Sequence, residues 1–285
     1  KRINWKNWQK GSTEDTTDLQ RLLGYICGFL IYLFLFMFGS QVMRGVLEEK
    51  TSRIVEVIVS SIKPFHLMMG KIIGIGLIGL TQFLAWLILT FTISAATQQV
   101  LSSEFPGQKT EQIAPSSIME SGVSQIQNEN NKEDVITGFF KQLKQINLFL
   151  IIAMFIFYFI GGYILYGSLF AAIGAASDNE TDTQQFILPI TIPLIIGLFV
   201  MINTFLNPSG KLAVWFSIIP FTSPIVMMAR IPFGIPPISQ LIASVLLLII
   251  TFLATTWFAG KIYRTGILMY GKKVSYREIW KWLKY

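Results

Sequence analysis

The stretch Arg44-Gly-Val-Leu-Glu-Glu-Lys-Thr-Ser-Arg-Ile-Val-Glu-Val-Ile-Val-Ser-Ser-Ile-Lys-Pro64 places charged residues between two long apolar runs of the chain. At helical spacing its apolar residues form one stripe, and its charged residues occupy the rest of the surface. This pattern predicts an amphipathic helix that lies along a membrane surface, ends before Pro64 and offers a polar face to a partner. The stripe comprises Leu47, Ile54, Val55, Ile58 and Ile62, and the charged residues are Glu48, Glu49, Lys50, Arg53 and Glu56.

The apolar runs on both sides of this stretch are long enough to cross a bilayer as helices. Hydrophobic residues make up 52% of the chain and charged residues only 14%, whereas soluble domains carry roughly 25% charged residues. About 20 apolar residues span the hydrocarbon as a helix. The sequence therefore predicts an all-α integral membrane protein with five transmembrane helices, at residues 22–43, 72–96, 148–173, 186–205 and 238–259.

A further apolar stretch, residues 212–228, contains Pro220 and Pro224 near its middle. Proline inside a helix removes a hydrogen bond and clashes with the preceding turn. We therefore expect a re-entrant hairpin within residues 206–237, with Pro220, Phe221 and Pro224 at its bend. A count of Lys and Arg on the two sides of the membrane favours a sixth span instead, so these two criteria disagree.

The connections between the predicted spans differ in composition. Residues 97–147 are polar, and their apolar residues recur at helical spacing after Glu133. We expect an extracytoplasmic loop there, with an amphipathic helix near its end. Residues 174–185 are expected to form a cytoplasmic loop. The basic segment 260–285 is expected to form a cytoplasmic tail facing anionic lipid.

The chain contains no motif for catalysis, metal binding or nucleotide binding. His66 is the lone histidine and has no second ligand at a suitable spacing, so we expect no metal site. A phosphate-binding Gly-x-x-x-x-Gly-Lys-Ser/Thr motif does not occur. The glycines of Gly74-Ile-Gly-Leu-Ile-Gly79 lie inside a predicted span, and we interpret them, together with Gly70, as helix-packing positions.

The predicted spans contain no Asp, Glu, Lys, Arg or His, which disfavours ion-coupled transport. Their polar side chains are candidates for lining a transport pathway, although each can instead bond its own helix backbone. These residues are Thr81, Gln82, Tyr158, Tyr163, Tyr166, Ser168, Thr191 and Asn203.

Three segments of the chain resemble the permeases of bacterial type-2 ABC (ABC-2) transporters, with the sodium-extrusion branch as the nearest. The resemblance implies a fold of six spans, of which this chain holds the last five. Residues 1–21 then end an extracytoplasmic domain. The matching segments are Glu48-Glu-Lys-Thr-Ser-Arg-Ile-Val-Glu-Val-Ile-Val-Ser-Ser-Ile-Lys-Pro-Phe-His-Leu-Met-Met-Gly-Lys71, Asp182-Thr-Gln-Gln-Phe-Ile-Leu-Pro-Ile-Thr-Ile-Pro193 and Pro220-Phe-Thr-Ser-Pro-Ile-Val-Met-Met-Ala-Arg230.

The resemblance also implies partners. In the family, the helix that corresponds to residues 44–71 is a coupling helix, which docks on an ABC nucleotide-binding (ATPase) subunit. Glu49 and Arg53 are spaced for an i,i+4 pair on the exposed face of such a helix. The residues expected to contact the ATPase subunit are Glu48, Glu49, Lys50, Thr51, Ser52, Arg53 and Glu56.

The remaining partners and the location follow from the same resemblance. A second permease subunit, identical or different, and membrane lipids are implied, but no nucleic acid. ATP and Mg²⁺ bind the ATPase subunit, and this chain holds no cofactor. The implied location is the bacterial cytoplasmic (inner) membrane, with several passes and a cytoplasmic C-terminus.

Two functions are compatible with these features. The first is the permease subunit of an ATP-driven exporter, whose cargo is sodium, a drug, a lipid or another compound. The alternative is a scaffold subunit of a mechanotransmissive ABC complex, which acts on a periplasmic partner without transport. An intramembrane enzyme would need catalytic residues in the spans, where the sequence has none.

Overall fold

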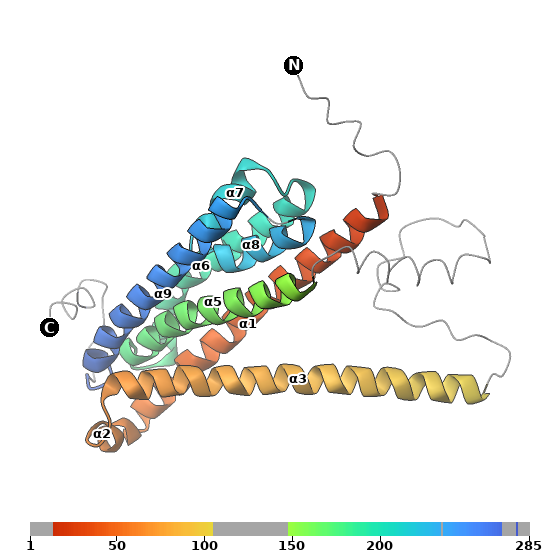
Figure 1. Ribbon diagram of the computed structural model, residues 1–285. Helices are drawn as coiled ribbons and strands as arrows, with labels where there is room; N and C mark the ends of the chain where they lie inside the picture. Colours follow the sequence, from red (N-terminus) through yellow and green to blue (C-terminus); the bar gives the residue numbers. More distant parts are fainter. Residues whose placement is uncertain (1–13, 105–147, 235, 270–277, 279–285) are drawn as a thin grey trace. The chain divides into compact units, whose positions relative to one another are not determined.

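The computed structural model describes residues 14–104, 148–234, 236–269 and 278, and the regular secondary structure of this part is helical (Figure 1). Helix lengths follow the apolar runs, since a helix satisfies its own backbone hydrogen bonds where water is absent. The elements are α1 (Glu14–Thr51), α2 (Ile54–Val59), α3 (Pro64–Glu104), α5 (Leu148–Ala176), α6 (Glu180–Leu206), α7 (Lys211–Ile218), α8 (Ser223–Arg230), the 3₁₀ helix η3 (Ile231–Phe233) and α9 (Ile238–Gly266).

The chain divides into two compact units. The first consists of Lys1–Gly76 together with Gln142–Tyr285, and the second of Leu77–Lys141. Of the second unit the structure describes residues 77–104, which form the later part of α3 and leave Trp86 exposed. Apart from these residues, the described helices belong to the first unit.

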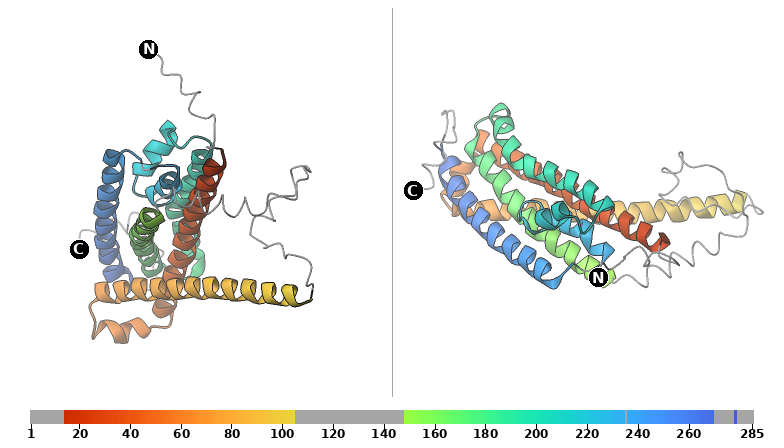
Figure 2. Two further views of the ribbon diagram at one scale, coloured as in Figure 1. Left: turned by 45° about the vertical axis from the view of Figure 1, so that its right-hand side comes forward. Right: turned by 90° about the horizontal axis from the view of Figure 1, so that it is seen from above.

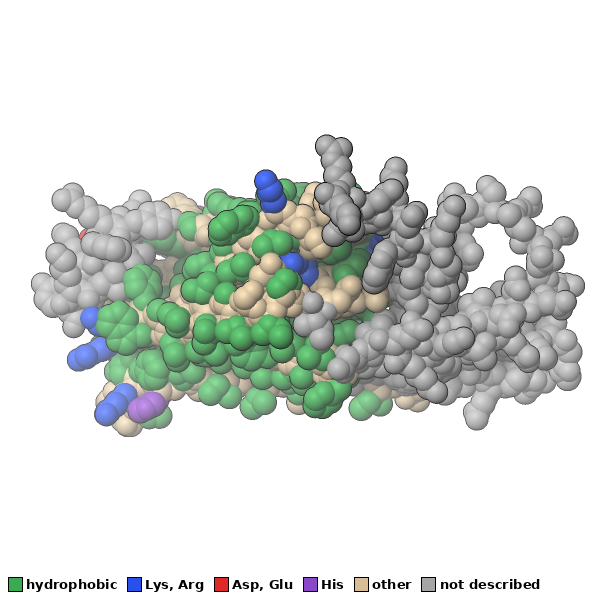
Figure 3. Space-filling view, turned by 45° about the horizontal axis from the view of Figure 1, so that its top comes forward, with side chains coloured by type: hydrophobic (Ala, Val, Ile, Leu, Met, Phe, Trp, Pro, Cys, Tyr) green, Lys and Arg blue, Asp and Glu red, His purple; other side chains and the backbone are tan. Residues whose placement is uncertain are grey.

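Within the described residues, five helices are long and apolar enough to cross a membrane. Hydrophobic side chains cover much of the described surface on the face shown in Figure 3, and soluble monomers rarely expose so much contiguous apolar surface. The predicted all-α integral membrane protein is therefore confirmed. The candidate spans are Gln20–Thr51, Pro64–Gln82, Phe149–Ala176, Glu180–Leu206 and Ile238–Gly266.

Helix α5 forms the centre of the first unit, between α1 and α9 (Figures 1 and 2). Tyr166 and Phe170 of α5 are fully buried, and the Phe170 ring lies against Gly39 of α1 beside the buried Phe38. Helices α6 and α8 also contact α1. The packed interior is therefore built mainly from α1 and α5.

Two glycines allow helix backbones to approach closely. A Cβ atom at Gly174 would lie 2.5 Å from the backbone oxygen of Met43, and one at Gly24 would lie 2.6 Å from that of Ala229. Small residues at such crossings are typical of membrane helices. Among the glycines interpreted as packing positions, Gly76 is one, because a Cβ there would lie 2.7 Å from the Tyr163 ring. For Gly70 and Gly74 the interpretation is wrong within this chain, because nothing lies within 4 Å of a Cβ at either position.

The charged stretch at residues 44–62 is not the single interfacial helix that its periodicity predicted. Helix α1 continues to Thr51, and α2 begins only at Ile54. Between them Arg53 adopts a left-handed conformation (φ 56°), which is uncommon for residues other than glycine. Its backbone N–H donates to the carbonyl of Lys50. The charged stretch is thus shared between the end of α1 and the short α2.

The proline-containing stretch is broken where the sequence predicted. Helix α7 ends at Ile218, Pro220 lies in the following turn, and Pro224 stands in the first turn of α8. Proline fits both places because its missing N–H and fixed φ do no harm in a turn or at a helix start. The break is confirmed, and its re-entry into the bilayer remains a prediction.

The described helices extend beyond the predicted spans. The connection expected over residues 174–185 is short, because α6 already begins at Glu180. The Asn179 side chain caps α6 by accepting the Asp182 backbone N–H at 3.0 Å. The amphipathic helix expected before residue 148, and most of the basic tail, lie outside the described residues.

Candidate functional site

Lys50 anchors the end of α1, with only 1% of its side chain exposed. Its Nζ donates a hydrogen bond to the backbone oxygen of Ala175 at 2.8 Å and lies 2.9 Å from Asp178 Oδ1. A buried ammonium needs this compensation, since an unpaired charge away from water is costly. Lys50 therefore holds α1 against the end of α5, which corrects its predicted place on an exposed docking face.

Glu49 makes the neighbouring contact, to the start of α3. Its Oε2 lies 2.6 Å from Lys71 Nζ, which also donates to the backbone oxygen of Gly45 at 2.5 Å. The i,i+4 spacing of Glu49 and Arg53 does not place them on adjoining turns of one helix, because α1 ends at Thr51. Glu49 is half-buried and links α1 to α3, so it is not the freely exposed residue expected.

The exposed residues of this junction gather around α2. Val57 is 74% exposed and Ile54 53%, whereas Val55 between them is fully buried and anchors the helix. Large apolar side chains left exposed among charged residues are typical of an interaction site. We call this segment the α2 surface, and it comprises Glu48, Thr51, Ser52, Arg53, Ile54, Glu56 and Val57.

Two members of the α2 surface were not predicted. The periodicity placed Ile54 on the buried stripe, and Val57 was not singled out. The reason is the break at Arg53, after which the helical phase starts again. The adjacent Thr51 and Ser52 have weak helix propensity, which was the only local signal for the break. The remaining members are exposed, as a docking surface requires.

The tyrosines proposed to line a pathway are buried and bond to other helices. The Tyr158 hydroxyl donates to Ser244 Oγ of α9 at 2.9 Å. The Tyr163 hydroxyl donates to the backbone oxygen of Ile72 in α3 at 2.7 Å. Such bonds satisfy polar groups that lipid cannot. These side chains therefore join helices within the chain and do not face an open path.

Tyr166 joins the core to the bend between α7 and α8. Its hydroxyl donates to the backbone oxygen of Phe221 at 2.7 Å, and the two rings meet edge to face with centroids 6.4 Å apart. Phe221 thus lies at the predicted bend. Tyr166 holds this bend in place, which is a packing role and not the predicted lining role.

The other candidate pathway residues fall into two groups. Ser168 and Thr191 donate to backbone oxygens of their own helices, at 2.9 and 3.1 Å. Thr81, in the second unit, does the same at 2.8 Å and is exposed, as are Gln82 and Asn203. Of the candidate residues, only these three exposed ones could line a path at the surface of this chain.

A buried arginine that the sequence interpretation did not single out organises the α7–α8 hairpin. Arg230 is 5% exposed and lies at the end of α8. Burial lowers the pKa of its guanidinium from the ordinary value, yet arginine remains charged in proteins. The side chain donates from Nε to the backbone oxygen of Pro208 at 2.9 Å, from Nη1 to Ser217 Oγ at 2.5 Å, and from Nη2 to Gln240 Oε1 at 3.0 Å.

Comparison with known proteins gives two relatives and a family. The relatives are "Uncharacterized protein YhaP" of Bacillus subtilis, 27% identical over 272 residues, and "Uncharacterized protein MJ1024" of Methanocaldococcus jannaschii, 25% identical over 272 residues. Each alignment covers 95% of this chain but only 57% and 56% of the relatives, so the chain spans just over half of their length. No solved structure matches the chain.

The family comparison covers most of the chain. The model that describes the ABC-2 family transporter proteins matches residues 1–261. This match includes the five candidate spans, apart from the last residues of α9, and the whole junction around α2. In agreement with the resemblance of its motifs, the chain therefore belongs to the ABC-2 family of transporter proteins, the membrane components of ABC transporters.

Proposed function

We propose that this chain is the permease subunit of an ATP-binding cassette exporter, driven by ATP hydrolysis on a separate nucleotide-binding subunit that also holds Mg²⁺. Membership of the ABC-2 family supports the permease role. The observation that carries the coupling is the α2 surface. It exposes Ile54 and Val57 beside Arg53 and Glu56, on a segment anchored by the buried Val55.

The anchoring of α2 suits it for transmitting force. Lys50 holds the helix before α2 against the end of α5, and Glu49 holds it against Lys71 of α3. A displacement of the α2 surface therefore moves three helices together, as in rigid-body switching transitions. We infer that closure of the ATPase subunits moves this junction and thereby opens or closes the path.

We place the path between two permease subunits, identical or different. The buried tyrosines bond within the chain, whereas Gln82 and Asn203 are exposed on its surface. The predicted spans carry no charged side chain, which favours hydrophobic or amphipathic cargo over a bare ion. Sodium, suggested by the nearest branch, is the competing cargo.

The orientation follows from the site of ATP hydrolysis. Since ATP is cytoplasmic, the α2 surface faces the cytoplasm in this proposal. Four candidate spans follow α2. Because four is an even number, this proposal puts the end of α9 on the cytoplasmic side as well. The proposed location is the bacterial cytoplasmic membrane.

The test is a gentle detergent purification of the full-length protein, with identification of its partners and an ATPase assay on the eluate. We expect a nucleotide-binding subunit to co-purify. Val57→Asp and Arg53→Glu should each lower its recovery about tenfold or more, as for central interface residues. Lys211→Glu is the matched control, since it makes the same charge change at an exposed position outside the α2 surface.

Two results would contradict the proposal. Recovery of the ATPase subunit that is equal for all variants would mean that α2 is not the docking surface. ATPase activity that responds only to a periplasmic protein, with no cargo flux in liposomes, would replace the exporter by the scaffold function.

A further inference from the structure

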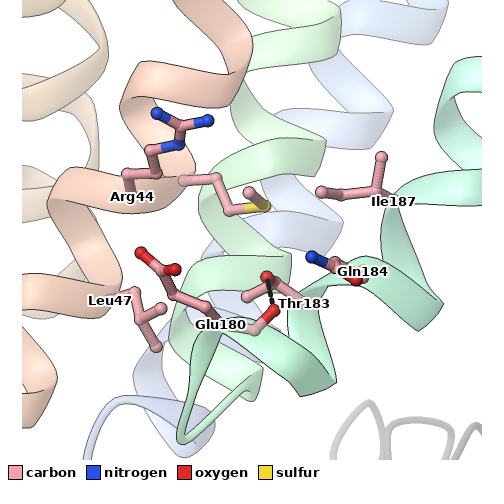
Figure 4. A pocket seen from close by; sticks show the side chains of 7 residues that line it. Arg44, Leu47, Glu180, Thr183, Gln184 and Ile187 are labelled. Carbon is pink, nitrogen blue, oxygen red and sulfur yellow. Dashed lines mark hydrogen bonds between the residues drawn. The ribbon is translucent and has the colours of Figure 1, made fainter.

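A pocket of about 270 Å³ lies between the end of α1 and the first turns of α6 (Figure 4). It shares no residue with the α2 surface. Asp178, which pairs with Lys50, lies in the turn just before α6, so the pocket is at the same end of the unit as the charged junction. The pocket is lined by Met43, Arg44 and Leu47 of α1 and by Glu180, Thr183, Gln184 and Ile187 of α6.

The lining of the pocket combines side chains of opposite charge with apolar side chains. Arg44 comes from α1 and Glu180 from the facing start of α6, and both side chains are exposed (Figure 4). Neither side chain makes a hydrogen bond or an ion pair with any residue in the part of the chain that the structure describes. Met43 and Leu47, which also line the pocket, are buried.

Folding of α6 does not explain the carboxylate of Glu180. Asn179 already caps the helix, and Asp182 supplies a second carboxylate to its first turn, where negative charge is favourable. Arg44 does not neutralise Glu180 either, because no ion pair joins them. Two opposite charges therefore share one pocket without contact, which leaves the space between them for a ligand that carries both signs.

We propose that this pocket binds the headgroup of an ethanolamine phospholipid. Arg44 donates to the phosphate oxygens, for which a guanidinium is well shaped. Glu180 and the Gln184 amide oxygen accept hydrogen bonds from the primary ammonium. The acyl chains follow Leu188 and Ile192, which are exposed further along α6. The pocket is smaller than the roughly 300–1,000 Å³ that enclose a whole drug-sized ligand, so it takes the headgroup alone.

The lining residues distinguish this lipid from the two common alternatives. A choline headgroup has no N–H to donate and is typically bound by aromatic rings, and none of the lining residues is aromatic. An anionic headgroup without an amine can place its phosphate at Arg44, but it has no ammonium for Glu180 and adds no positive charge to offset that carboxylate. Of these three headgroups, only ethanolamine offers both a phosphate for Arg44 and an N–H donor for Glu180.

The test is native mass spectrometry of the full-length protein, purified with equal mole fractions of phospholipids that carry ethanolamine, choline or glycerol headgroups. We expect ethanolamine lipid to be retained on the order of tenfold more than either competitor, as for one charge-assisted contact. Arg44→Gln should lower retention of all phosphate headgroups. Glu180→Gln should abolish the preference for ethanolamine over choline.

Matched controls separate the pocket from its surroundings. Asp182→Asn removes a carboxylate from the same helical turn as Glu180, and Arg264→Gln removes an exposed arginine of α9; neither residue lines the pocket. Both controls should retain the wild-type preference. Thermal unfolding in detergent checks that each variant is folded.

Equal retention of the three lipids by the wild-type protein would overturn the proposal. A preference for glycerol phospholipid, or a preference for ethanolamine that survives Glu180→Gln, would also do so. The measurement needs neither ATP nor an ATPase subunit, so its outcome is independent of the proposed transport function.

Discussion

The junction around α2 and the α7–α8 hairpin each bury a cation, but they compensate its charge differently. At the junction, Lys50 contacts the carboxylate of Asp178, and a second ion pair joins α1 to α3 beside it. In the hairpin, the hydrogen bonds of Arg230 go to neutral oxygens on three separate segments. These acceptors are the backbone oxygen of Pro208 and the side chains of Ser217 and Gln240.

The difference follows from the shapes of the two side chains. Lysine is a compact charge and is compensated well by one carboxylate, whereas the guanidinium fork reaches several acceptors at once. When one member of an ion pair is substituted, a second substitution that neutralises the other member can restore most of the lost stability. Arg230 in the hairpin has three acceptors, so no single second substitution can compensate for its loss. We therefore expect the junction to tolerate redesign and the hairpin to resist it.

The largest effect should come from Arg230→Met. This change removes three charge-assisted hydrogen bonds and leaves Ser217 Oγ without its donor, so we expect a loss of about 3–5 kcal/mol in the free energy of unfolding. Equilibrium unfolding in mixed micelles measures it. Arg230→Lys keeps the charge but not the fork, and should recover less than half of the loss. If the Arg230→Lys variant were as stable as the wild type, the hairpin would need only a positive charge, as the junction does, and not the guanidinium fork.

A smaller loss, about 2–3 kcal/mol, is expected for Lys50→Met. The reason for the smaller value is that Asp178 stays 23% exposed and can be partly solvated once its partner is gone. The double variant Lys50→Met with Asp178→Asn should regain most of the loss, because no uncompensated charge remains. The double-mutant cycle gives the coupling energy. Additive losses would mean that the pair is not the stabilising contact.

Glu49→Gln should cost about 1 kcal/mol, since the pair with Lys71 is partly exposed and such pairs contribute little. The loss should shrink as salt is raised, because screening weakens exposed pairs. The same unfolding assay at low and high salt checks this. A loss that does not depend on salt would indicate that Glu49 acts through packing.

The smallest effect on stability should come from Val57→Asp, within about 0.5 kcal/mol of the wild type. Its side chain is 74% exposed, whereas that of Val55, two residues earlier, is fully buried. Val55→Asp should therefore destabilise the protein clearly in the same assay. If both substitutions were equally harmful, α2 would be a packed element and not a docking surface.

Much of the fold could be predicted from the sequence, because it depends on local properties. The apolar runs that became α5 and α9 were visible as uninterrupted segments, and Pro220 and Pro224 marked the break between α7 and α8. The candidate site was predicted in position but not in detail. The stripe that included Ile54 assumed one continuous helix, which the left-handed Arg53 interrupts.

The sequence by itself determined that this protein is a helical membrane protein with a charged segment between its first two predicted spans. Helix formation in lipid depends on the length and polarity of each run, and these are readable residue by residue. Only the tertiary structure decided which charged and polar side chains are exposed. Lys50 is buried and donates to the backbone oxygen of Ala175, which lies 125 positions away in the sequence. The Tyr158 and Tyr163 hydroxyls likewise bond to residues of other helices. Such pairings are set by how the helices pack, which no local pattern contains.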